Sequence, residues 1–361
     1  MKRRWWVLLL LVSACAPVAS YQAVTRGYQF DFPRDYYAHP DFRTEWWYYT
    51  GHLDAEDGNT YGFELVFFRR RTESDYRFGL PLWWFTNPAV VSHFAITDIA
   101  AQRFVYGEHI GLRPPYRGGA RSDRLLLWSE GWQAAQMGDA QHLSAALGDY
   151  EIDLSLASQK PPVLHGDHGF SRKGVNSDAS YYFSLTRLKT AGWLRKGNRW
   201  LHVVGGSAWM DHEILSGSLG PELTGWDWFS LQLDSGEDLM LFLLRKREGD
   251  IDPDSSGTYV DRQGNTTHIT SEQFAIKEVE YWTSPNTRTR YPVVWEVTLD
   301  TPRPMSFRVR AVLPASELLL HMTSVNYWEG AVDAAGRDGD KPLHGRGYVE
   351  MSGRDEPFSG I

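Results

Sequence analysis

Short stretches of alternating apolar and polar residues fill the chain after residue 40, separated by glycine, asparagine and aspartate. Such alternation is typical of half-buried strands in an antiparallel sheet. Residues 45–54 and 59–70 are predicted to form a hairpin. No long stretch after the N-terminus has a helical period, so we expect an all-β protein. Further strands are predicted over 90–98, 103–109, 123–129, 142–147, 150–156, 180–187 and 201–210.

A second hairpin is predicted over residues 226–249, and its first strand repeats the sequence of the first hairpin. Trp46 aligns with Trp226, and Tyr48 aligns with Trp228. A repeat of this kind indicates two related structural units in one chain.

The repeat predicts β-domains over residues 40–213 and 214–352, followed by a tail over 353–361. Antiparallel strands hide their edges best by closing into barrels. A small barrel has room for side chains or for one small ligand. We therefore expect two antiparallel β-barrel domains.

The N-terminus joins the basic residues MKRR to the apolar run WWVLLLLV and the small residues SAC. This order is typical of a secretory signal peptide, and the apolar run is too short to span a bilayer. Residues 12–15 have the pattern of a lipobox, which predicts a signal peptide over 1–14, acylation of Cys15 and a linker over 15–39. Ala16 then favours the periplasmic face of the outer membrane. A signal peptide cut near Ala19 is the alternative.

Composition narrows the function classes. The formal net charge of −8 argues against a nucleic-acid-binding protein, which would show a basic face. Aromatic residues make up 14% of the chain and include 16 tryptophans. Tryptophan favours lined cavities and interfaces, although a β-rich core that uses rings as filler is the alternative.

Nine ordered segments carry a resemblance to a known family: DFRTEWWYYTGHL, YGFELVFFRR, SHFAITD, HGDHGFSRKG, ASYYFSLTRL, GSAWMDHE, GWDWFSLQLDSGEDLM, YWEGAV and GYVEMSG. In this order they resemble the AttH/CrtC-type family of lipocalin-like secreted proteins. The resemblance implies two lipocalin-like barrels.

The same resemblance implies a range of activities. The family includes carotenoid 1,2-hydratases, relatives that hydrate isoprenoid side chains or assist Diels–Alder cyclisations, and lipoproteins described only as secreted hydrolases. Some members are encoded beside ABC transporter components, so an ABC export system is a candidate partner. This chain has GSAWMDHE where carotenoid hydratases carry a histidine-rich stretch, which puts a carotenoid substrate in doubt.

Candidate catalytic residues follow one another in the stretch WMDHE. On a strand, Trp209, Asp211 and Glu213 face the same side. If that side lines a cavity, burial would keep a carboxyl group protonated, and the indole could stabilise a developing cation. Such a pair suits a cofactor-independent hydratase or cyclase. Alternatively, both carboxylates could bind backbone or arginine between the barrels.

Carboxylates also stand among aromatic rings at TEWWYY and YWEG. Glu45, Trp47 and Tyr49 share one face of a strand, and Trp328 precedes Glu329. A carboxylate among rings must be paired or hydrogen-bonded. These residues, with Trp226 and Trp228, are candidate ligand-binding residues, and a structural role for the two glutamates is the alternative.

The glycine-rich stretch HGDHGFSRKG supplies His165, His168 and Arg172 on a predicted long loop over 158–178. A polar lid that uses His168 and Arg172 to bind ligand and a domain-contact loop are both open. We predict no metal site, because no third histidine lies nearby in the sequence. A hydrolase has little support, because G-x-S-x-G and H-E-x-x-H are missing from the sequence.

The sequence therefore predicts a lipid-anchored protein that binds a hydrophobic ligand, lipid-like or isoprenoid-like, in an aromatic cavity without a cofactor. A hydratase or cyclase of the carotenoid 1,2-hydratase type is the alternative, with hydrolysis a weaker one.

Overall fold

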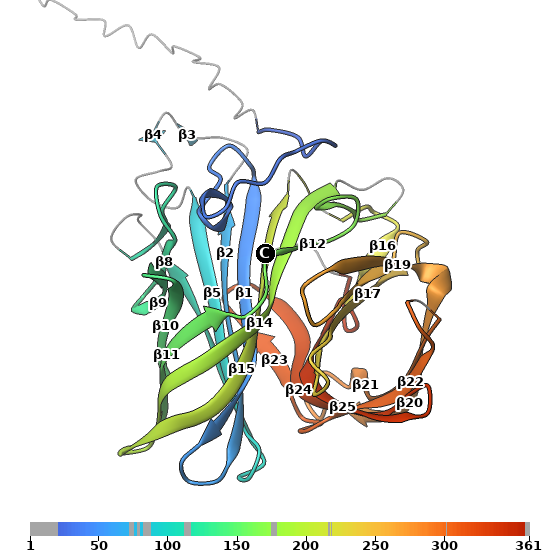
Figure 1. The fold of residues 1–361 in the computed structure, drawn as a ribbon. Helices are drawn as coiled ribbons and strands as arrows, with labels where there is room; N and C mark the ends of the chain where they lie inside the picture. Colours follow the sequence, from blue (N-terminus) through green and yellow to red (C-terminus); the bar gives the residue numbers. More distant parts are fainter. Residues whose placement is uncertain are drawn as a thin grey trace, which may run out of the picture.

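The computed structural model describes residues 21–71, 76–77, 80–81, 88–111, 117–174, 179–215, 217, 219–300 and 302–357. The predicted signal peptide and Cys15 lie outside these residues. Figure 1 shows two curled β-sheets side by side, the first in blue to yellow-green and the second in yellow to red. Short 3₁₀-helices occur at η1 (Arg34–Tyr36) and η3 (Ser271–Gln273). Within the described ranges no helix is long and apolar enough to cross a membrane.

The first sheet curls into a nearly closed barrel with the strand order β6-β5-β2-β1-β15-β14-β11-β10-β9-β8-β7. Two further strands, β12 and β13, pair with β14, and β3 and β4 pair separately. The bounds are β1 (Thr44–Ala55), β2 (Thr60–Arg70), β3 (Tyr76–Arg77), β4 (Leu80–Pro81), β5 (Ala89–Asp98), β6 (Arg103–Gly111), β7 (Gly118–Ala120), β8 (Leu126–Ser129), β9 (Trp132–Met137), β10 (Ala140–Leu147), β11 (Tyr150–Ser158), β12 (Val163–Leu164), β13 (Phe170–Arg172), β14 (Ala179–Lys196) and β15 (Arg199–Leu215).

The second sheet forms a more open half-barrel with the strand order β19-β18-β17-β16-β25-β24-β22-β21-β20, and β23 pairs with β24. The bounds are β16 (Leu223–Leu233), β17 (Asp238–Lys246), β18 (Ser256–Val260), β19 (Thr266–Thr270), β20 (Phe274–Thr283), β21 (Arg290–Leu299), β22 (Met305–Ala311), β23 (Glu317–Leu320), β24 (Val325–Asp338) and β25 (Lys341–Ser352). The expected all-β fold with two lipocalin-like domains is confirmed.

The two predicted hairpins occupy equivalent places. In the first sheet β1 lies between β2 and β15, and in the second sheet β16 lies between β17 and β25. In chain order these are the first, second and last long strands of each sheet, so β1 and β16 correspond. Tyr48 of β1 lies opposite Asp211 of β15, and Trp228 of β16 lies opposite Glu350 of β25. The alignment of Tyr48 with Trp228 therefore also makes Asp211 and Glu350 equivalent.

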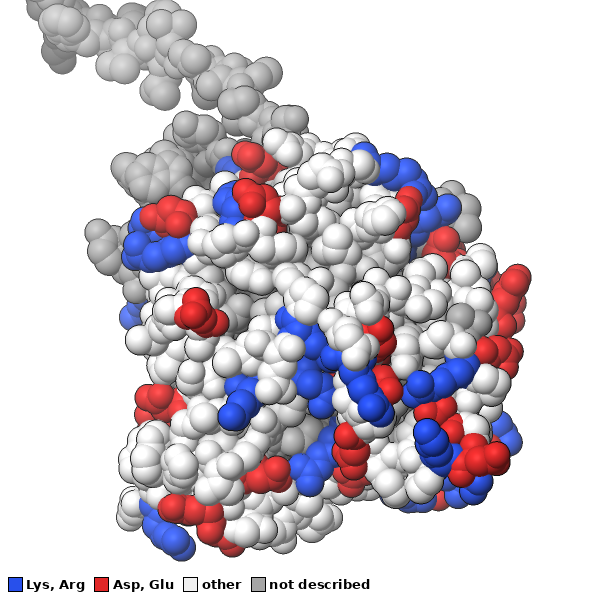
Figure 2. Space-filling model, viewed as in Figure 1, with Lys and Arg blue, Asp and Glu red and all other residues white. Residues whose placement is uncertain are grey.

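Apolar side chains form a separate core inside each barrel and a third cluster between the sheets. Tyr48, Tyr182, Trp209, Trp228 and Tyr348 belong to this third cluster. On the face shown in Figure 2, acidic and basic side chains are interspersed, with basic ones along the junction between the barrels. The aromatic content is therefore divided between two barrel interiors and one buried interface.

Candidate active site between the two barrels

A cavity of about 340 Å³ lies between the two sheets. This volume falls in the range of small-molecule sites. Its walls combine aromatic rings with carboxyl groups from both sheets. The lining includes Arg43, Trp46, Tyr48, Phe68, Arg70, Lys173, Tyr182, Asp211, Glu213, Leu219, Trp226, Trp228, Phe242, Leu244, Arg247, Tyr327 and Glu350.

Strand alternation places these side chains. On β1, Trp46 and Tyr48 face the cavity, whereas Trp47 and Tyr49 point into the core of the first barrel. One face of the stretch WWYY therefore lines the cavity and the other packs in the barrel core. This explains why four aromatic rings follow one another, a pattern that a strand with only one buried face does not require. Of the rings predicted to bind ligand, Trp226 and Trp228 line the cavity.

Asp211 stands on the wall formed by the first sheet and accepts three hydrogen bonds. Tyr182 donates to Oδ2 at 2.7 Å, Trp209 Nε1 donates to Oδ1 at 2.5 Å, and the Ser184 hydroxyl donates to Oδ1. Burial raises the pKa of Asp211 to about 7, and the three donors oppose this rise. Asp211 can therefore change its protonation state near neutral pH.

Two neighbours of Asp211 were also predicted catalytic residues. Trp209 is buried in the cluster between the sheets, and its indole nitrogen is bound to Asp211. Glu213 lines the cavity, where it forms an ion pair with Lys173 and accepts a hydrogen bond from Ser180. The structure thus brings Asp211 and Glu213 to the same cavity, and it places Trp209 behind Asp211.

Glu350 stands on the opposite wall, on β25 of the second sheet, and the sequence analysis did not select it. Burial raises the pKa of Glu350 to about 8, with a further contribution from the Glu64 carboxylate, and a hydrogen bond with Trp226 opposes the rise. In the sequence, the segment GYVEMSG contributes to the family resemblance and contains no second acid beside Glu350. Its strand pairs with the strand that contains WDW, just as the strand that contains DHE pairs with WWY, and this repeated pairing is the signal that could have identified Glu350.

Tyr182 joins the two walls. Its hydroxyl accepts a hydrogen bond from Trp228 Nε1 at 3.0 Å and donates to Asp211. Lys173 lies 5.0 Å above the ring of Tyr182 and 4.9 Å above that of Phe242. One ammonium group therefore lies over rings from both sheets at the cavity, where cation–π attraction holds it.

Glu329 lies behind the cavity and accepts a hydrogen bond from Tyr48. Burial raises its pKa well above the usual value, and Glu64 and Glu350 add to this rise. Trp328 points to the other side of β24, where it is buried in the second barrel and donates to the carbonyl of Pro314 at 2.8 Å. The two residues of the predicted pair therefore belong to different environments.

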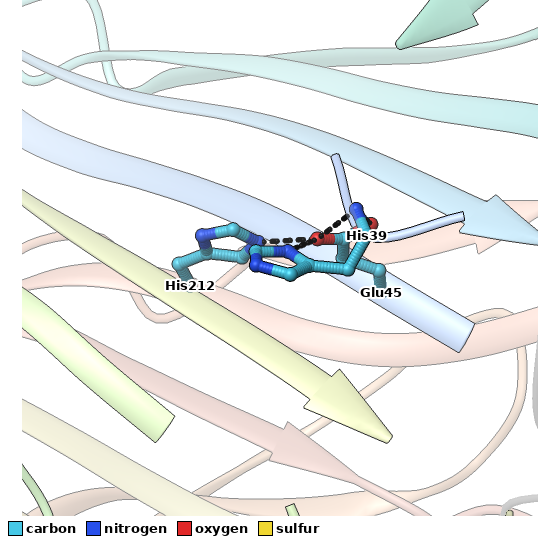
Figure 3. A group of neighbouring side chains, drawn as sticks. All are labelled: His39, Glu45 and His212. Atoms are coloured by element: carbon cyan, nitrogen blue, oxygen red, sulfur yellow. Dashed lines mark hydrogen bonds and ion pairs between the residues drawn. The ribbon is translucent and has the colours of Figure 1, made fainter. Parts of the chain in front are cut away.

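Glu45 lies outside the cavity, in the network of His39, Glu45 and His212 that Figure 3 shows. Glu45 Oε1 accepts from His39 Nδ1 at 2.7 Å and from His212 Nε2 at 2.9 Å, and Oε2 accepts from Arg69 Nε at 3.0 Å. Burial alone would raise the pKa of Glu45, but Arg69 and His39 hold it well below its usual value. These donors already satisfy the carboxylate, and the Arg69 guanidinium opposes a metal cation there. The network fits a structural role.

The described part of the predicted loop, residues 158–174, lies at the junction between the sheets. Lys160 Nζ lies 2.7 Å from Asp238, and Arg172 lies 3.3 Å from Asp254. His165 contacts Thr258 of the second sheet at 2.8 Å and Ser184 of the first at 2.6 Å. The described part of this loop therefore contacts both sheets, and its Lys173 lines the cavity. Ligand binding by His168 and Arg172 stays a prediction, because neither residue lines this cavity.

The two histidines of this loop do not share a site. His165 is buried between Thr258 and Ser184, whereas His168 is exposed beside a second hollow that the segment 27–32 also lines.

The fold and the cavity define the class of protein: two lipocalin-like barrels with a potential active site between them. The chain belongs to the AttH-like family, whose model matches residues 23–354. No curated protein sequence matches the chain.

Solved structures of other proteins share the fold. A candidate AttH from Nitrosomonas europaea is 29% identical with a TM-score of 0.82, covering 93% of this chain and 100% of that one. Kievitone hydratase from Nectria haematococca is 13% identical with a TM-score of 0.71, covering 93% and 97%. CghA, solved with Sch210972, is 14% identical with a TM-score of 0.57, covering 95% and 96%.

Proposed function

We propose that this protein is a cofactor-independent lyase of hydratase or cyclase type that acts on a carbon–carbon double bond between the two barrels. One observation carries the proposal. Two carboxyl groups whose pKa values are raised toward neutrality, Asp211 and Glu350, line opposite walls of one aromatic cavity. Paired titratable groups in unlike environments are typical of acid–base catalysis. The fold shared with kievitone hydratase supports this proposal over a pure carrier.

The surroundings of the two carboxyl groups favour different roles. Three donors stabilise an ionised Asp211, whereas carboxyl neighbours favour the acid form of Glu350. In hydration Glu350 donates its proton to one alkene carbon, and the rings of Trp226 and Trp228 face the resulting carbocation. A water oxygen then bonds to the cationic carbon while Asp211 takes the proton that this water loses.

Each turnover leaves Glu350 ionised and Asp211 protonated, and proton exchange through cavity water restores the starting state. In dehydration the roles reverse, and Asp211 is then the acid. The sequence predicted instead that Asp211 or Glu213 would protonate the double bond. In a cyclase, an internal alkene takes the place of water.

The test is incubation in H₂¹⁸O with alkene-bearing compounds, beginning with kievitone, followed by mass spectrometry for the gain of one labelled water. Asp211→Asn and Glu350→Gln keep the side-chain shapes and should each lower turnover by about 10²–10⁴-fold, the usual contribution of a positioned acid or base. Glu317→Gln is the matched control, since Glu317 is a buried glutamate bound by Ser284 and Thr287 away from the cavity. Full turnover by both cavity variants would contradict the proposal.

A carrier of hydrophobic ligands is the second candidate, because indoles from both sheets line the cavity. Native mass spectrometry separates the two. Under the lyase proposal a bound alkene is released with the mass of one added water or as a cyclised isomer, and under the carrier proposal it is recovered unchanged.

We also propose that Cys15 is acylated and anchors the protein at the periplasmic face of the outer membrane. The lipobox pattern at residues 12–15 supports this. Cys15→Ser should release the protein from membranes, and membrane-bound, processed Cys15→Ser protein would contradict it.

A further inference from the structure

Three glutamates from both sheets lie together behind and beside the cavity: Glu64 on β2, Glu329 on β24 and Glu350 on β25. Glu329 lies directly opposite Glu350 in the pairing of β24 with β25, and Glu64 acts electrostatically on both. Glu64 and Glu329 are almost fully buried, and Glu350 is accessible through the cavity that it lines. Within the described part of the chain, none of the three forms an ion pair with a basic side chain. Buried carboxyl groups without a cation favour the neutral form.

Hydrogen bonds cross the domain interface in both directions at this cluster. Tyr327 of the second sheet donates to Glu64 Oε1 of the first at 2.7 Å, and Tyr48 of the first sheet donates to Glu329 Oε1 of the second. The other oxygen of each carboxyl group is buried without a hydrogen-bond partner among the described residues. An ionised carboxylate would require more donors than one tyrosine provides.

The two histidines beside the cluster bring no positive charge. Burial lowers the pKa of His93 to about 3, so its ring is neutral, and its Nδ1 lies 2.9 Å from the hydroxyl of Tyr327. Burial also lowers the pKa of His52. The cations that line the cavity with Glu350 are Arg43, Arg70, Lys173 and Arg247, and Lys173 is paired with Glu213. Other titratable groups face the three glutamates from five strands. They are Tyr48 and His52 on β1, His93 on β5, Asp211 and Glu213 on β15, Tyr327 on β24 and Tyr348 on β25.

The carboxyl groups act on one another in the same direction. Burial raises the pKa of Glu64 to about 8. Burial and the Glu64 carboxylate raise the pKa of Glu350 to about 8, and burial with Glu64 and Glu350 raises that of Glu329 well above its usual value. Ionisation of one group therefore makes ionisation of the next less favourable.

We propose that Glu64 and Glu329 are positioning residues, whose carboxyl groups across the domain interface keep Glu350 in its acid form in the cavity. The catalytic use of that proton rests on the proposed function, whereas the protonation of Glu350 does not require turnover. The cluster confines proton donation to pH values at which the interface carries no carboxylate charge. Above that range, repulsion between carboxylates of the two sheets weakens the contact that closes the cavity.

The test is infrared spectroscopy of the whole protein carrying ¹³C-labelled glutamate, with the stretching band of protonated carboxyl groups followed against pH. The difference between wild type and Glu350→Gln isolates the band of Glu350. In a Glu64→Gln background this band should disappear about one pH unit lower than in wild type, because a like charge next to it has been removed. Glu329→Gln should act in the same direction, and Glu317→Gln should leave the midpoint in place. An unchanged midpoint in both cluster variants would overturn the proposal.

Thermal unfolding against pH gives a second measurement. Because the pKa of Glu64 is raised in the folded protein, the unfolded chain ionises first, and stability falls as pH rises from about 4.5 to about 8. Glu64→Gln should reduce this fall, and an unaltered pH dependence would count against the proposal. If the glutamine variants do not fold, Tyr327→Phe removes the donor that favours ionised Glu64. Glu64 then carries less negative charge beside Glu350, so the midpoint of the Glu350 band should move to lower pH. If the midpoint of the Glu350 band shifts but no turnover is found, this inference stands and the lyase proposal is unsupported. If turnover is found but the midpoint does not shift, the lyase proposal stands and this inference is wrong.

Discussion

Asp211 and Glu350 occupy equivalent positions in the two sheets. Each lies on the strand of its sheet that comes last in the chain, where Asp211 is opposite Tyr48 and Glu350 is opposite Trp228, the residue that aligns with Tyr48. Both side chains line the cavity between the sheets. A duplicated strand pairing has thus placed one carboxyl group on each wall. The local environments then differ, because Asp211 receives three hydrogen bonds and Glu350 is surrounded by other carboxyl groups.

This arrangement predicts a bell-shaped dependence of kcat/KM on pH for hydration. The rate should rise through about pH 7 as Asp211 ionises and fall above about pH 8 as Glu350 loses its proton. Initial rates with a compound that is hydrated would show the two limbs, and Glu64→Gln should move only the upper limb to lower pH. A flat profile between pH 5 and 9 (roughly the range over which both groups titrate) would contradict the assignment.

Replacing Tyr182 with phenylalanine should raise the pKa of Asp211, because one donor to its carboxylate is removed. We expect the lower limb of the pH profile to move up by about one unit, with a smaller loss of turnover than in Asp211→Asn. Tyr181→Phe is the neighbouring control, since its hydroxyl binds the backbone of Thr25 outside the cavity. Equal shifts in both variants would indicate a general structural effect.

The sequence predicted the barrels well for a physical reason. Alternation with period two and the repeated hairpin are local properties, and they placed β1, β2, β16 and β17 correctly. The site was only partly predictable. Asp211 and Glu213 stood out because WMDHE combines an indole with two acids, but Glu350 stands in a plain segment. Its role depends on pairing with a strand about 120 residues earlier.

The same limit applied to Glu45 and Trp47. The sequence predicts both as ligand-binding residues because a carboxylate among rings is unusual, and no observation tests that role directly. Only the fold shows that His39, Arg69 and His212 surround Glu45 and that Trp47 belongs to a barrel interior. Local sequence could not indicate which of the two faces of β1 meets the second barrel.

The segment 158–174 should hold the two barrels together through Lys160. Its ion pair with Asp238 is buried, and Arg187 shares the same carboxylate at 2.6 Å. Lys160→Met should lower the unfolding free energy by about 1–3 kcal/mol, less than the usual loss from breaking a buried pair, because Arg187 remains. Chemical denaturation would measure this, and faster proteolysis within the loop should accompany it. Arg172→Met, at a more exposed pair with Asp254, should have little effect, and an equal loss there would refute a special role for Lys160.

The network around Glu45 should stabilise the first barrel across a defined pH window. Because the pKa of Glu45 is lowered in the folded protein, its contribution is complete above about pH 4.5 and is lost as pH falls through the lowered value. Burial would lower the pKa of His39, but the Glu45 carboxylate and hydrogen bonds with Asp35 and Glu45 raise it to about 9. Its contribution is therefore complete below about pH 6.5 and is lost as pH rises through about 9.

Glu45→Gln should therefore lower the unfolding free energy at pH 7 by about 3–5 kcal/mol, because it leaves the buried charges of Arg69 and His39 uncompensated. It should also flatten the loss of stability between pH 6.5 and 9, since His39 then titrates closer to its unfolded value. Denaturation curves at several pH values would measure both effects, and Glu296→Gln, which breaks an exposed pair with Arg308, is the control. If Glu45→Gln cost no more stability than Glu296→Gln but abolished ligand binding, Glu45 would have to be reassigned from structure to function.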